Sequence, residues 1–398
     1  MINRVVAVIV AGVALATLSA CTGQPSVPEA ATAVKSTPTS TVTAANSADS
    51  IPPMTQPWKD TPLPPTVVQP VLLSAISAAD PSDVLAAGAE NTVQVFTTAV
   101  NGLYMGQLLI LGWTGKAWSA QPIDVSFHGK VVTLASGAHG TGWAIAEDMA
   151  GRYHLLRLST GVWRDTAYPD SNAAGLVLTD VAVAPDGTAW AVGVPVPAGD
   201  LAGYQLPVKS VVPLILHWTG GAWHQVATPI DGWWPVQAVA TADGVWLAGE
   251  VQPSSSSDPS HVRVAVAHLT ADGWQTATEP PLPGYLFEGV GLLAVASDGS
   301  AWIQADVSYA ALAEGAPGGE LLHWSPGHWE ASLPWYGYNC LVLEKDTLVM
   351  VSDQPKPAGA KLPPVVPTPN SATSNQVVVV PGTTQLWADG GDWIAYYP

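Results

Sequence analysis

Short runs of alternating apolar and polar residues, separated by tight-turn residues, recur along most of the chain. The clearest unit starts at residues 178–184 with Leu-Thr-Asp-Val-Ala-Val-Ala, turns at Pro-Asp-Gly over 185–187, and returns over 188–193 as Thr-Ala-Trp-Ala-Val-Gly. After a variable stretch it resumes over 214–226, where Gly-Gly separates two further runs. β-Branched and aromatic residues favour strands, and Asp-Gly or Gly-Gly between two such runs marks a hairpin. The pattern predicts a four-stranded antiparallel unit made of two hairpins joined by a long loop.

Both hairpins of this unit recur. Further copies of the first hairpin cover residues 74–88, 133–146, 238–249, 293–305 and 341–352. Further copies of the second hairpin cover residues 109–121, 154–168, 265–278, 321–333 and 384–397. The last strands of the units carry Trp118, Trp163, Trp223, Trp274, Trp329 and Trp393. A four-stranded unit that repeats about every 50 residues is typical of β-propeller blades. We therefore expect an all-β fold, a β-propeller with six four-stranded blades over residues 71–398 and with tryptophans packed between the blades.

One segment near the start of the repeats leaves the closure of the ring open. Residues 57–62, Pro-Trp-Lys-Asp-Thr-Pro, resemble the last strand at 162–166, Val-Trp-Arg-Asp-Thr. The segment either adds to the final blade and joins the two ends of the chain, or belongs to a seventh, irregular blade with residues 375–398. Seven blades are therefore the alternative to six, and the propeller domain is expected over residues 56–398.

The N-terminal residues have the pattern of an export signal. Arg4 precedes an uninterrupted apolar run over residues 5–17, which ends in Leu-Ser-Ala-Cys over 18–21. Such a run is too short to span a membrane comfortably, and small residues precede the cleavage point. The last four residues resemble the lipobox of bacterial lipoproteins. This resemblance implies that the signal peptide, residues 1–20, is removed and that the Cys21 thiol carries a diacylglycerol, with palmitate-type acyl chains as membrane anchor.

The next segment and the overall charge restrict the partners. Residues 21–55 are rich in Thr, Ser, Pro and Ala, a composition that cannot bury enough apolar surface to fold, so we expect a lipid-anchored, disordered linker. No later stretch approaches the roughly 18 apolar residues of a membrane helix. The formal charge of −18 repels nucleic acid, which excludes a phosphate-backbone partner.

Candidate catalytic and metal-binding residues are few. His217, His268 and His323 occupy the same place in three units, and equivalent positions in different blades lie too far apart to share a metal ion. Acids such as Asp180 and Glu250 could serve a glycosidase, but nothing in the sequence brings them together. We therefore assign no catalytic residue, no metal site and no cofactor.

Aromatic residues gather in the irregular connections. In a propeller, the loop between the second and third strands and the connection to the next blade emerge at the same end, and here these segments are the long ones, beginning with 89–107. The aromatic residues that we expect to contact a ligand or partner there are Trp233, Trp234, Tyr285, Phe287, Trp335, Tyr336 and Tyr338. Exposed rings would suit a glycan or a protein. The alternative is that these aromatic side chains fill the end of the central channel of the propeller or pack against the long loops.

The repeats resemble those of bacterial extracytoplasmic propellers, such as regulator sensor domains and kelch-like or WD-like secreted repeats. The Asp-Gly-Thr-Ala-Trp hairpin at 186–190 and the Leu-His-Trp run at 216–218 carry this resemblance. It covers roughly residues 71–398 and implies the fold rather than a reaction. Together with the lipobox and the aromatic connections, it leads us to expect a lipid-anchored, extracytoplasmic protein of the cell envelope that acts as a non-catalytic binding or scaffold module. The alternative is a propeller glycoside hydrolase or lyase that acts on glycans. Two carboxylates and an Arg near the centre of the ring would favour the enzyme, and small side chains on the first strands would favour binding.

Overall fold

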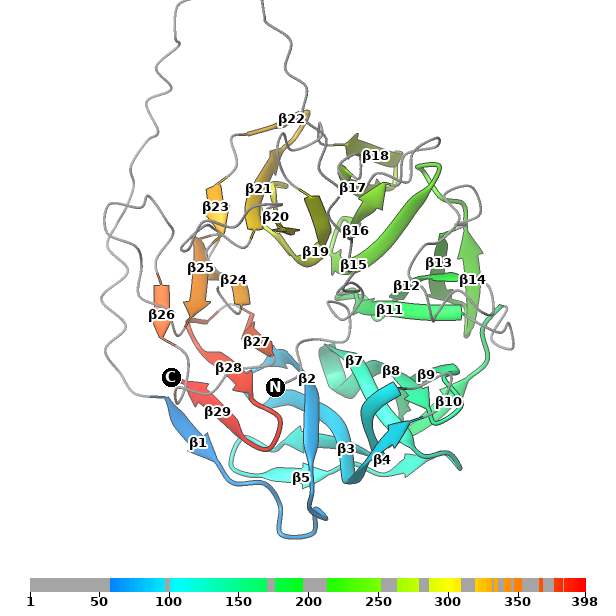
Figure 1. Cartoon of the computed structure of the whole chain (residues 1–398), viewed down its shortest axis with the longest axis vertical. Coiled ribbons are helices and arrows are strands. Elements are labelled where there is room, and N and C mark those ends of the chain that lie inside the picture. Colours follow the sequence, from blue (N-terminus) through cyan, green and yellow to red (C-terminus); the bar gives the residue numbers. More distant parts are fainter. Residues whose placement is uncertain are drawn as a thin grey trace, which may run out of the picture. The chain divides into compact units, whose positions relative to one another are not determined.

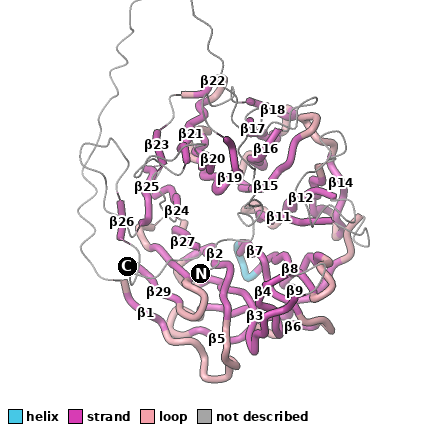
Figure 2. Tube along the Cα trace, viewed as in Figure 1, coloured by secondary structure: helices cyan, strands magenta, loops and turns pink. Residues whose placement is uncertain are grey.

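The computed structural model describes residues 58–96, 101–169, 176–195, 213–251, 263–278, 286–308, 319–330, 333–335, 340–344, 347–352, 365–367, 376–381 and 383–398. Within these ranges the chain is almost entirely strand, with one short 3-10 helix at Ala138–Gly140 (Figure 2). None of the helical structure within these ranges is long and apolar enough to cross a membrane. Four regular, four-stranded blades follow one another from residue 72.

The first blade consists of β2 (Leu72–Asp80), β3 (Asp83–Phe96), β4 (Asn101–Trp113) and β5 (Trp118–Ala120). The second consists of β7 (Gly129–Gly137), β8 (Thr141–Asp148), β9 (Tyr153–Ser159) and β10 (Val162–Thr166), with β6 (Ile123–Asp124) parallel to β10. The third consists of β11 (Leu176–Val183), β12 (Ala189–Pro195), β13 (Leu214–Thr219) and β14 (Ala222–Val226). The fourth consists of β15 (Trp233–Thr241), β16 (Gly244–Val251), β17 (Arg263–Thr270) and β18 (Gly273–Thr278).

The later blades are less regular. The fifth consists of β19 (Leu286–Val295), β20 (Ala301–Ser308), β21 (Gly319–Ser325) and β22 (His328–Trp329), with β23 (Leu333–Trp335) also paired to β21. The sixth consists of β24 (Cys340–Glu344), β25 (Thr347–Ser352) and β26 (Val365–Pro367). The seventh consists of β27 (Gln376–Val379), β28 (Leu386–Asp389), β29 (Ile394–Tyr397) and β1 (Lys59–Thr61).

The sheets follow one another around a common centre, as in a β-propeller (Figure 1). Their first strands are innermost: β2, β7, β11, β15, β19, β24 and β27 contact one another in that order, and β27 contacts β2. The described strands therefore give seven first strands around the centre where the repeat count favoured six. They form six hydrogen-bonded sheets, because the pair Gly106–Gly129 joins the first two blades into one sheet. The sequence pattern merged residues 341–352 and 384–397 into one unit, but the first hairpin is β24–β25 and the second is β28–β29 of the next sheet.

Strand β1 closes the last sheet. Lys59, Asp60 and Thr61 pair with Tyr396, Ala395 and Ile394 of β29. The Thr61 hydroxyl donates a hydrogen bond to the Ile394 carbonyl at 3.0 Å and accepts one from Trp118 Nε1 of the first blade at 2.8 Å. The segment around residues 57–62 thus adds to the final sheet, and this sheet is also the seventh blade, so the two alternatives drawn from the sequence coincide.

A β-bulge interrupts the first strand of several blades, and a glycine of the second strand faces it. Leu73 pairs with Gly88, Leu178 with Gly193, and Pro235 with Gly249, each beside a register shift. A Cβ on Gly249 would overlap the carbonyl oxygen of Trp234, and the other two glycines face backbone in the same way. The glycine at this place in each of these second strands is therefore required by close backbone approach.

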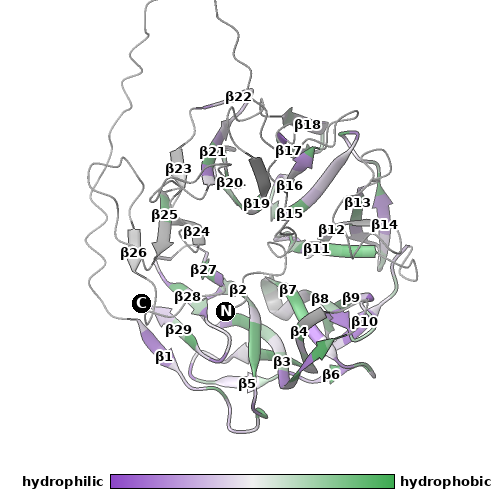
Figure 3. Ribbon diagram, viewed as in Figure 1, coloured by the Kyte–Doolittle hydropathy of each residue, from purple (hydrophilic) through white to green (hydrophobic). Residues whose placement is uncertain are grey.

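Tryptophans fill the interfaces between blades. Trp143 of the second blade meets Trp218 and Trp223 of the third, with ring centroids 4.8 and 4.6 Å apart. Trp387 of the seventh blade meets Trp118 of the first at 5.4 Å. Figure 3 shows the apolar residues along inner strands such as β11 and polar residues on outer strands such as β10 and β14. The expectation that indoles pack between neighbouring blades is confirmed for these residues.

Candidate functional site

The connections of the propeller lie at two ends. Turns between the first and second strands of a blade, and between its third and fourth strands, lie at one end, which we call the turn side. Connections between the second and third strands, and from one blade to the next, lie at the other end, which we call the loop side. Candidate binding residues were expected at the loop side.

The first blade extends beyond its neighbours at the loop side. Strands β3 and β4 have 14 and 13 residues, whereas β8 and β9 of the second blade have 8 and 7. The last pair between β2 and β3 is Leu72 with Ala89, but β3 and β4 stay paired as far as Phe96 and Asn101. We call this extension, residues 91–96 and 101–106, the arm.

The arm has a buried face and an exposed face. Met105 is fully buried, and Val95 is 8% exposed, with Leu103 packed against both. Tyr104, next to Met105 and on the opposite face, is 38% exposed, and Phe96, at the end of the pairing, is 68% exposed. Val93, which pairs with Met105, is 57% exposed. Neighbouring side chains of a strand point to opposite faces, so an alternating segment can bury one row and present the other. The arm therefore presents an aromatic face from a supported hairpin.

Backbone contacts fix the base of the arm. Asn91 N–H donates to the Val68 carbonyl at 2.9 Å, and Thr92 N–H donates to the Pro70 carbonyl at 3.0 Å. Glu90 Oε2 accepts a hydrogen bond from Val68 N–H at 2.7 Å. These bonds tie the arm to the strand connection that precedes β2, so the exposed rings stand on an ordered support.

The large apolar residues exposed in the described part of the chain all lie at the loop side. They are Val68, Val93, Phe96, Tyr104 and Met149, each between 38% and 68% exposed. Met149, in the β8–β9 turn, is next to the arm because its N–H donates to His128 O at 3.2 Å and Gly129 pairs with Gly106 of β4. Apolar side chains that gather on one part of a surface mark interaction sites more often than scattered ones do.

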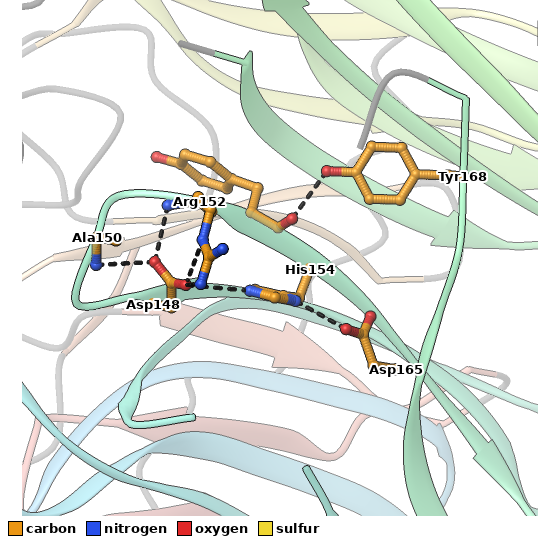
Figure 4. Close-up of polar contacts among 7 residues, drawn as sticks. Asp148, Ala150, Arg152, His154, Asp165 and Tyr168 are labelled. Atoms are coloured by element: carbon orange, nitrogen blue, oxygen red, sulfur yellow. Dashed lines mark hydrogen bonds and ion pairs between the residues drawn. The ribbon is translucent and has the colours of Figure 1, made fainter. Parts of the chain in front are cut away.

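A hydrogen-bonded cluster holds the β8–β9 turn (Figure 4). Asp148 Oδ1 accepts hydrogen bonds from the Ala150 and Arg152 backbone N–H groups at 2.8 and 2.9 Å. Asp148 Oδ2 accepts one from Arg152 Nε at 2.8 Å and lies 3.5 Å from His154 Nε2. His154 Nδ1 lies 2.8 Å from Asp165 Oδ2. Asp148 is thus saturated by structural contacts and orders the turn that carries Met149.

His154 sits between two carboxylates and under an aromatic ring. Phe127, from the connection between the first two blades, stacks on it with ring centroids 3.9 Å apart. Burial favours the neutral imidazole, but the hydrogen bonds and charges of Asp165 and Asp148 outweigh it and raise the pKa of His154. The same hydrogen bonds, led by the Arg152 backbone, hold the pKa of Asp148 below its usual value although burial opposes this.

We expect His154 to stabilise the fold more strongly in mild acid than in base. A raised pKa in the folded state gives stability that is complete below the unfolded value of about 6.5 and is lost as the pH rises through the folded value. The variant His154→Phe keeps the stack on Phe127 but loses both carboxylate contacts. It should cost about 1–2 kcal/mol of unfolding free energy at pH 5.5, and clearly less at pH 8.5. Urea unfolding at both pH values measures this.

The matched control is His224→Phe, because His224 is exposed on β14. It should change the unfolding free energy by less than about 0.5 kcal/mol at either pH. An equal cost of His154→Phe at both pH values would contradict a charged His154.

A buried ion pair lies beside this cluster. Lys130 Nζ of β7 is 3.4 Å from Glu147 Oε2 of β8, and their side chains are only 5% and 7% exposed. Burial lowers the pKa of Lys130 and raises the pKa of Glu147, and each charge partly offsets the effect on the other. The pair fixes the loop-side ends of two strands of the second blade.

Asp180 lies in the middle of the inner strand β11 and is enclosed by two neighbouring blades. Asp180 of β11 accepts hydrogen bonds from Ala238 N–H of β15 at 2.9 Å, from Val181 N–H at 2.9 Å and from Thr133 Oγ1 of β7 at 3.2 Å. Burial is the main influence and raises the pKa of Asp180 to about 6, although these three hydrogen bonds favour the carboxylate. Asp180 therefore links three consecutive blades. Among the inner-strand side chains that the structure describes, no second carboxylate joins it at this level.

The three repeated histidines have a packing role at the turn side. His217, His268 and His323 stack on Trp190, Trp246 and Trp302, with ring centroids 3.9 Å apart in each case. Each His belongs to the third strand and each Trp to the second. In the described ranges no group of three or more His, Cys, Asp or Glu residues could hold a metal ion.

The structure describes only part of the aromatic set expected from the sequence. Trp233 is fully buried between the third and fourth blades, which agrees with the alternative of packed rings and corrects its expected contact with a partner: it lies on β15, where the strand alternation points it into the core. Trp234 is partly buried against the interface with the fifth blade. Phe287 belongs to β19 and Trp335 to β23, but their side chains lie outside the described residues. Tyr285, Tyr336, Tyr338 and Cys21 also lie outside them.

The sequence interpretation missed the arm, because it treated residues 89–107 as a long loop. The signal that could have found it is the alternation Thr-Val-Gln-Val-Phe over 92–96, opposite Leu-Tyr-Met over 103–105. Such β-branched and aromatic alternation favours paired strands over a loop.

No protein-family model matches the chain, and no curated protein matches its sequence. Solved structures are similar to it. Virginiamycin B lyase from Staphylococcus aureus has 13% identity, with 85% of this chain and 98% of that chain covered and a TM-score of 0.46. YCF48 bound to D1 peptide has 14% identity, with 86% and 97% covered and a TM-score of 0.38. The β-propeller domain of Cps50 (Swd1) from Myceliophthora thermophila has 11% identity, with 82% and 83% covered and a TM-score of 0.40. The blades described above form a β-propeller, and the similarity to these solved structures is one of fold alone.

Proposed function

We propose that this protein is a non-catalytic β-propeller binding or scaffold module, held at the outer face of a bacterial membrane by a lipid on Cys21, and that it binds its partner at the loop side. The observation that carries the proposal is the position of the exposed apolar side chains: in the described part of the chain, Val68, Val93, Phe96, Tyr104 and Met149 all lie at that end. Exposed apolar clusters are typical of binding surfaces.

The chemistry of the neighbouring polar groups supports binding over catalysis. Asp148 and Asp180 use their carboxylate oxygens to hold a turn and to link blades. Inner-strand residues such as Ser77 and Ser136, whose hydroxyls are 2.9 Å apart, are small and bond to each other across blades. Small side chains at this place are the feature that favours binding over a glycan hydrolase or lyase.

Site-specific photo-cross-linking tests the proposal. A benzoylphenylalanine at Tyr104 or Met149 of the full chain, expressed in its native host, should form a specific adduct in the membrane fraction. The same residue at Thr219 or Ala222, which are exposed at the turn side, is the matched control and should form none. With Cys21→Ser, the adduct should leave the membrane fraction, because the lipid anchor is lost.

Two results would count against the proposal. Adducts of equal yield from both ends would remove the special role of the loop side. Membrane retention of the Cys21→Ser protein would remove the lipid anchor.

A further inference from the structure

The arm is uncharged in a strongly acidic protein. From Asn91 to Gly115 there is no Asp, Glu, Lys or Arg, although the whole chain carries a formal charge of −18. The arm also has no Pro. Proteins usually protect a protruding strand from pairing with other chains by placing charges or Pro on it. The arm has neither charged residues nor Pro, and it contains β-branched and aromatic residues. Its composition therefore allows a strand of another protein to pair with it.

One edge of the arm is open to such an addition. The first edge of β4 pairs with β3 from Asn101 to Gly112. The second edge pairs with β5 at residues 111–113 and with β7 at Gly106. Among the strands that the structure describes, none pairs with the second edge between Asn101 and Met105. The contact of Gly106 with Gly129 marks where this edge begins, next to the exposed Met149.

Side chains beside this edge give it an apolar character. Tyr104 lies on β4 itself, next to buried Met105 and on the other face, and Phe96 is opposite Asn101 on β3, one strand away from the edge. Both rings are exposed. An added strand would gain main-chain hydrogen bonds from the edge and apolar contact with the rings, which is the usual division between affinity and specificity in strand addition.

Charge decides between the possible occupants. A charged side chain buried against the neutral arm would lose its hydration without a partner, so the docked segment is itself uncharged. The field of the acidic protein attracts cationic proteins and repels a second copy of this chain. The occupant that fits both conditions is an uncharged strand carried by a basic protein.

We propose that the arm binds an extended, uncharged segment of a cationic protein as an additional β-strand along the Asn101–Met105 edge of β4. This inference rests on the proposed function and names the site and the class of partner for it.

The probe is the synthetic peptide Lys-Lys-Thr-Val-Thr-Phe-Thr-Val-Lys-Lys, measured against the full chain by fluorescence anisotropy. Its control is the same peptide with N-methyl groups on alternate central residues, which keeps charge and composition but removes the pairing edge. The control should bind at least about tenfold more weakly, because several main-chain hydrogen bonds are lost.

The protein variant is Phe96→Glu with Tyr104→Glu. Added negative charge attracts the cationic probe, so a loss of affinity by the folded variant comes from the loss of the docking surface. We expect this variant to bind the probe at least about tenfold more weakly. The charge-matched control, Thr219→Glu with Ala222→Glu at the turn side, should bind at least as well as the original protein.

Three outcomes would overturn the inference: equal binding of the N-methylated peptide, undiminished binding by the Glu variant of the arm, or self-association through the arm. Sedimentation detects self-association, which salt would strengthen by screening like charges, whereas salt would weaken binding of the probe. Cross-links at Tyr104 in cells with no binding of the probe would reject the strand partner and leave the proposed function intact. If neither the cross-links in cells nor the binding of the probe were seen, both the strand partner and the proposed function would be rejected.

Discussion

Replacing Trp387 by Ala should lower the free energy of unfolding by about 3–5 kcal/mol, the range for removing a large buried aromatic side chain. Trp387 is fully buried where the seventh blade meets the first. Its ring centroid lies 5.1 Å from Trp113 and 5.4 Å from Trp118, in edge-on contacts that stabilise aromatic pairs beyond their buried area. Truncation would leave a cavity at the joint between the two ends of the chain, where packing and the β1–β29 pairs hold the ring closed.

Urea unfolding followed by tryptophan fluorescence measures this effect, with Tyr104→Ala as the control. Tyr104 is an exposed aromatic residue of the first blade, so its removal should cost less than about 0.5 kcal/mol. A cost for Trp387→Ala no larger than that of the control would mean that closure does not depend on this packing.

The repeat was visible in the sequence because its signals are local. Asp-Gly at 186–187 and Gly-Gly at 220–221 specify tight turns, and the runs beside them specify strands that pair with their neighbours. The hairpins of the first five blades therefore appear at the expected places. Pairing between strands that are distant in sequence has no such signal, and this is where the prediction failed.

The sixth and seventh blades show where prediction from local sequence signals fails. Strand β26 runs parallel to β25, so no tight turn in the sequence precedes it. Strand β27 begins the next blade without an Asp-Gly turn after it. Two hairpins at 341–352 and 384–397 then looked like one unit. The attachment of β1 to β29 joins residues at opposite ends of the chain, and only the resemblance of residues 57–62 to another strand suggested it.

The sequence predicts which end of the propeller carries the long connections, but not which side chains are exposed there. Chain connectivity alone predicts that end, the loop side, and it is where we propose the binding site. Which aromatic side chains are exposed depends on the orientation of each strand. Trp233 begins β15 and points into the core, whereas Tyr104 lies on the part of β4 that extends beyond the neighbouring strands of its blade. A one-residue change in register exchanges the two faces of a strand, so composition alone cannot decide between them.

Replacing Lys130 by Met should also cost about 3–5 kcal/mol at pH 8, because it leaves the buried Glu147 carboxylate without its counter-charge. Met keeps most of the apolar volume of the Lys side chain, so packing changes little. Glu147 already has a raised pKa through burial, and loss of the Lys130 charge removes the main influence that lowers it. The variant should therefore bind a proton at Glu147 in the folded state at a pH where the unfolded chain, with a Glu pKa of about 4.3, does not.

The sign of the pH dependence follows. Between the unfolded and folded pKa values the folded state holds more protons, so the stability of Lys130→Met should rise as the pH falls from 8 to 5. Urea midpoints at pH 5, 6.5 and 8 measure this. The double variant Lys130→Met with Glu147→Gln is the control, because it removes both charges: it should recover much of the lost stability at pH 8 and show little of the pH response. If the single variant were as stable as the original protein at pH 8, or lost stability on acidification relative to the double variant, Glu147 would not be a buried charge that depends on Lys130. The ordered β7–β8 ends beside the arm would then need another explanation.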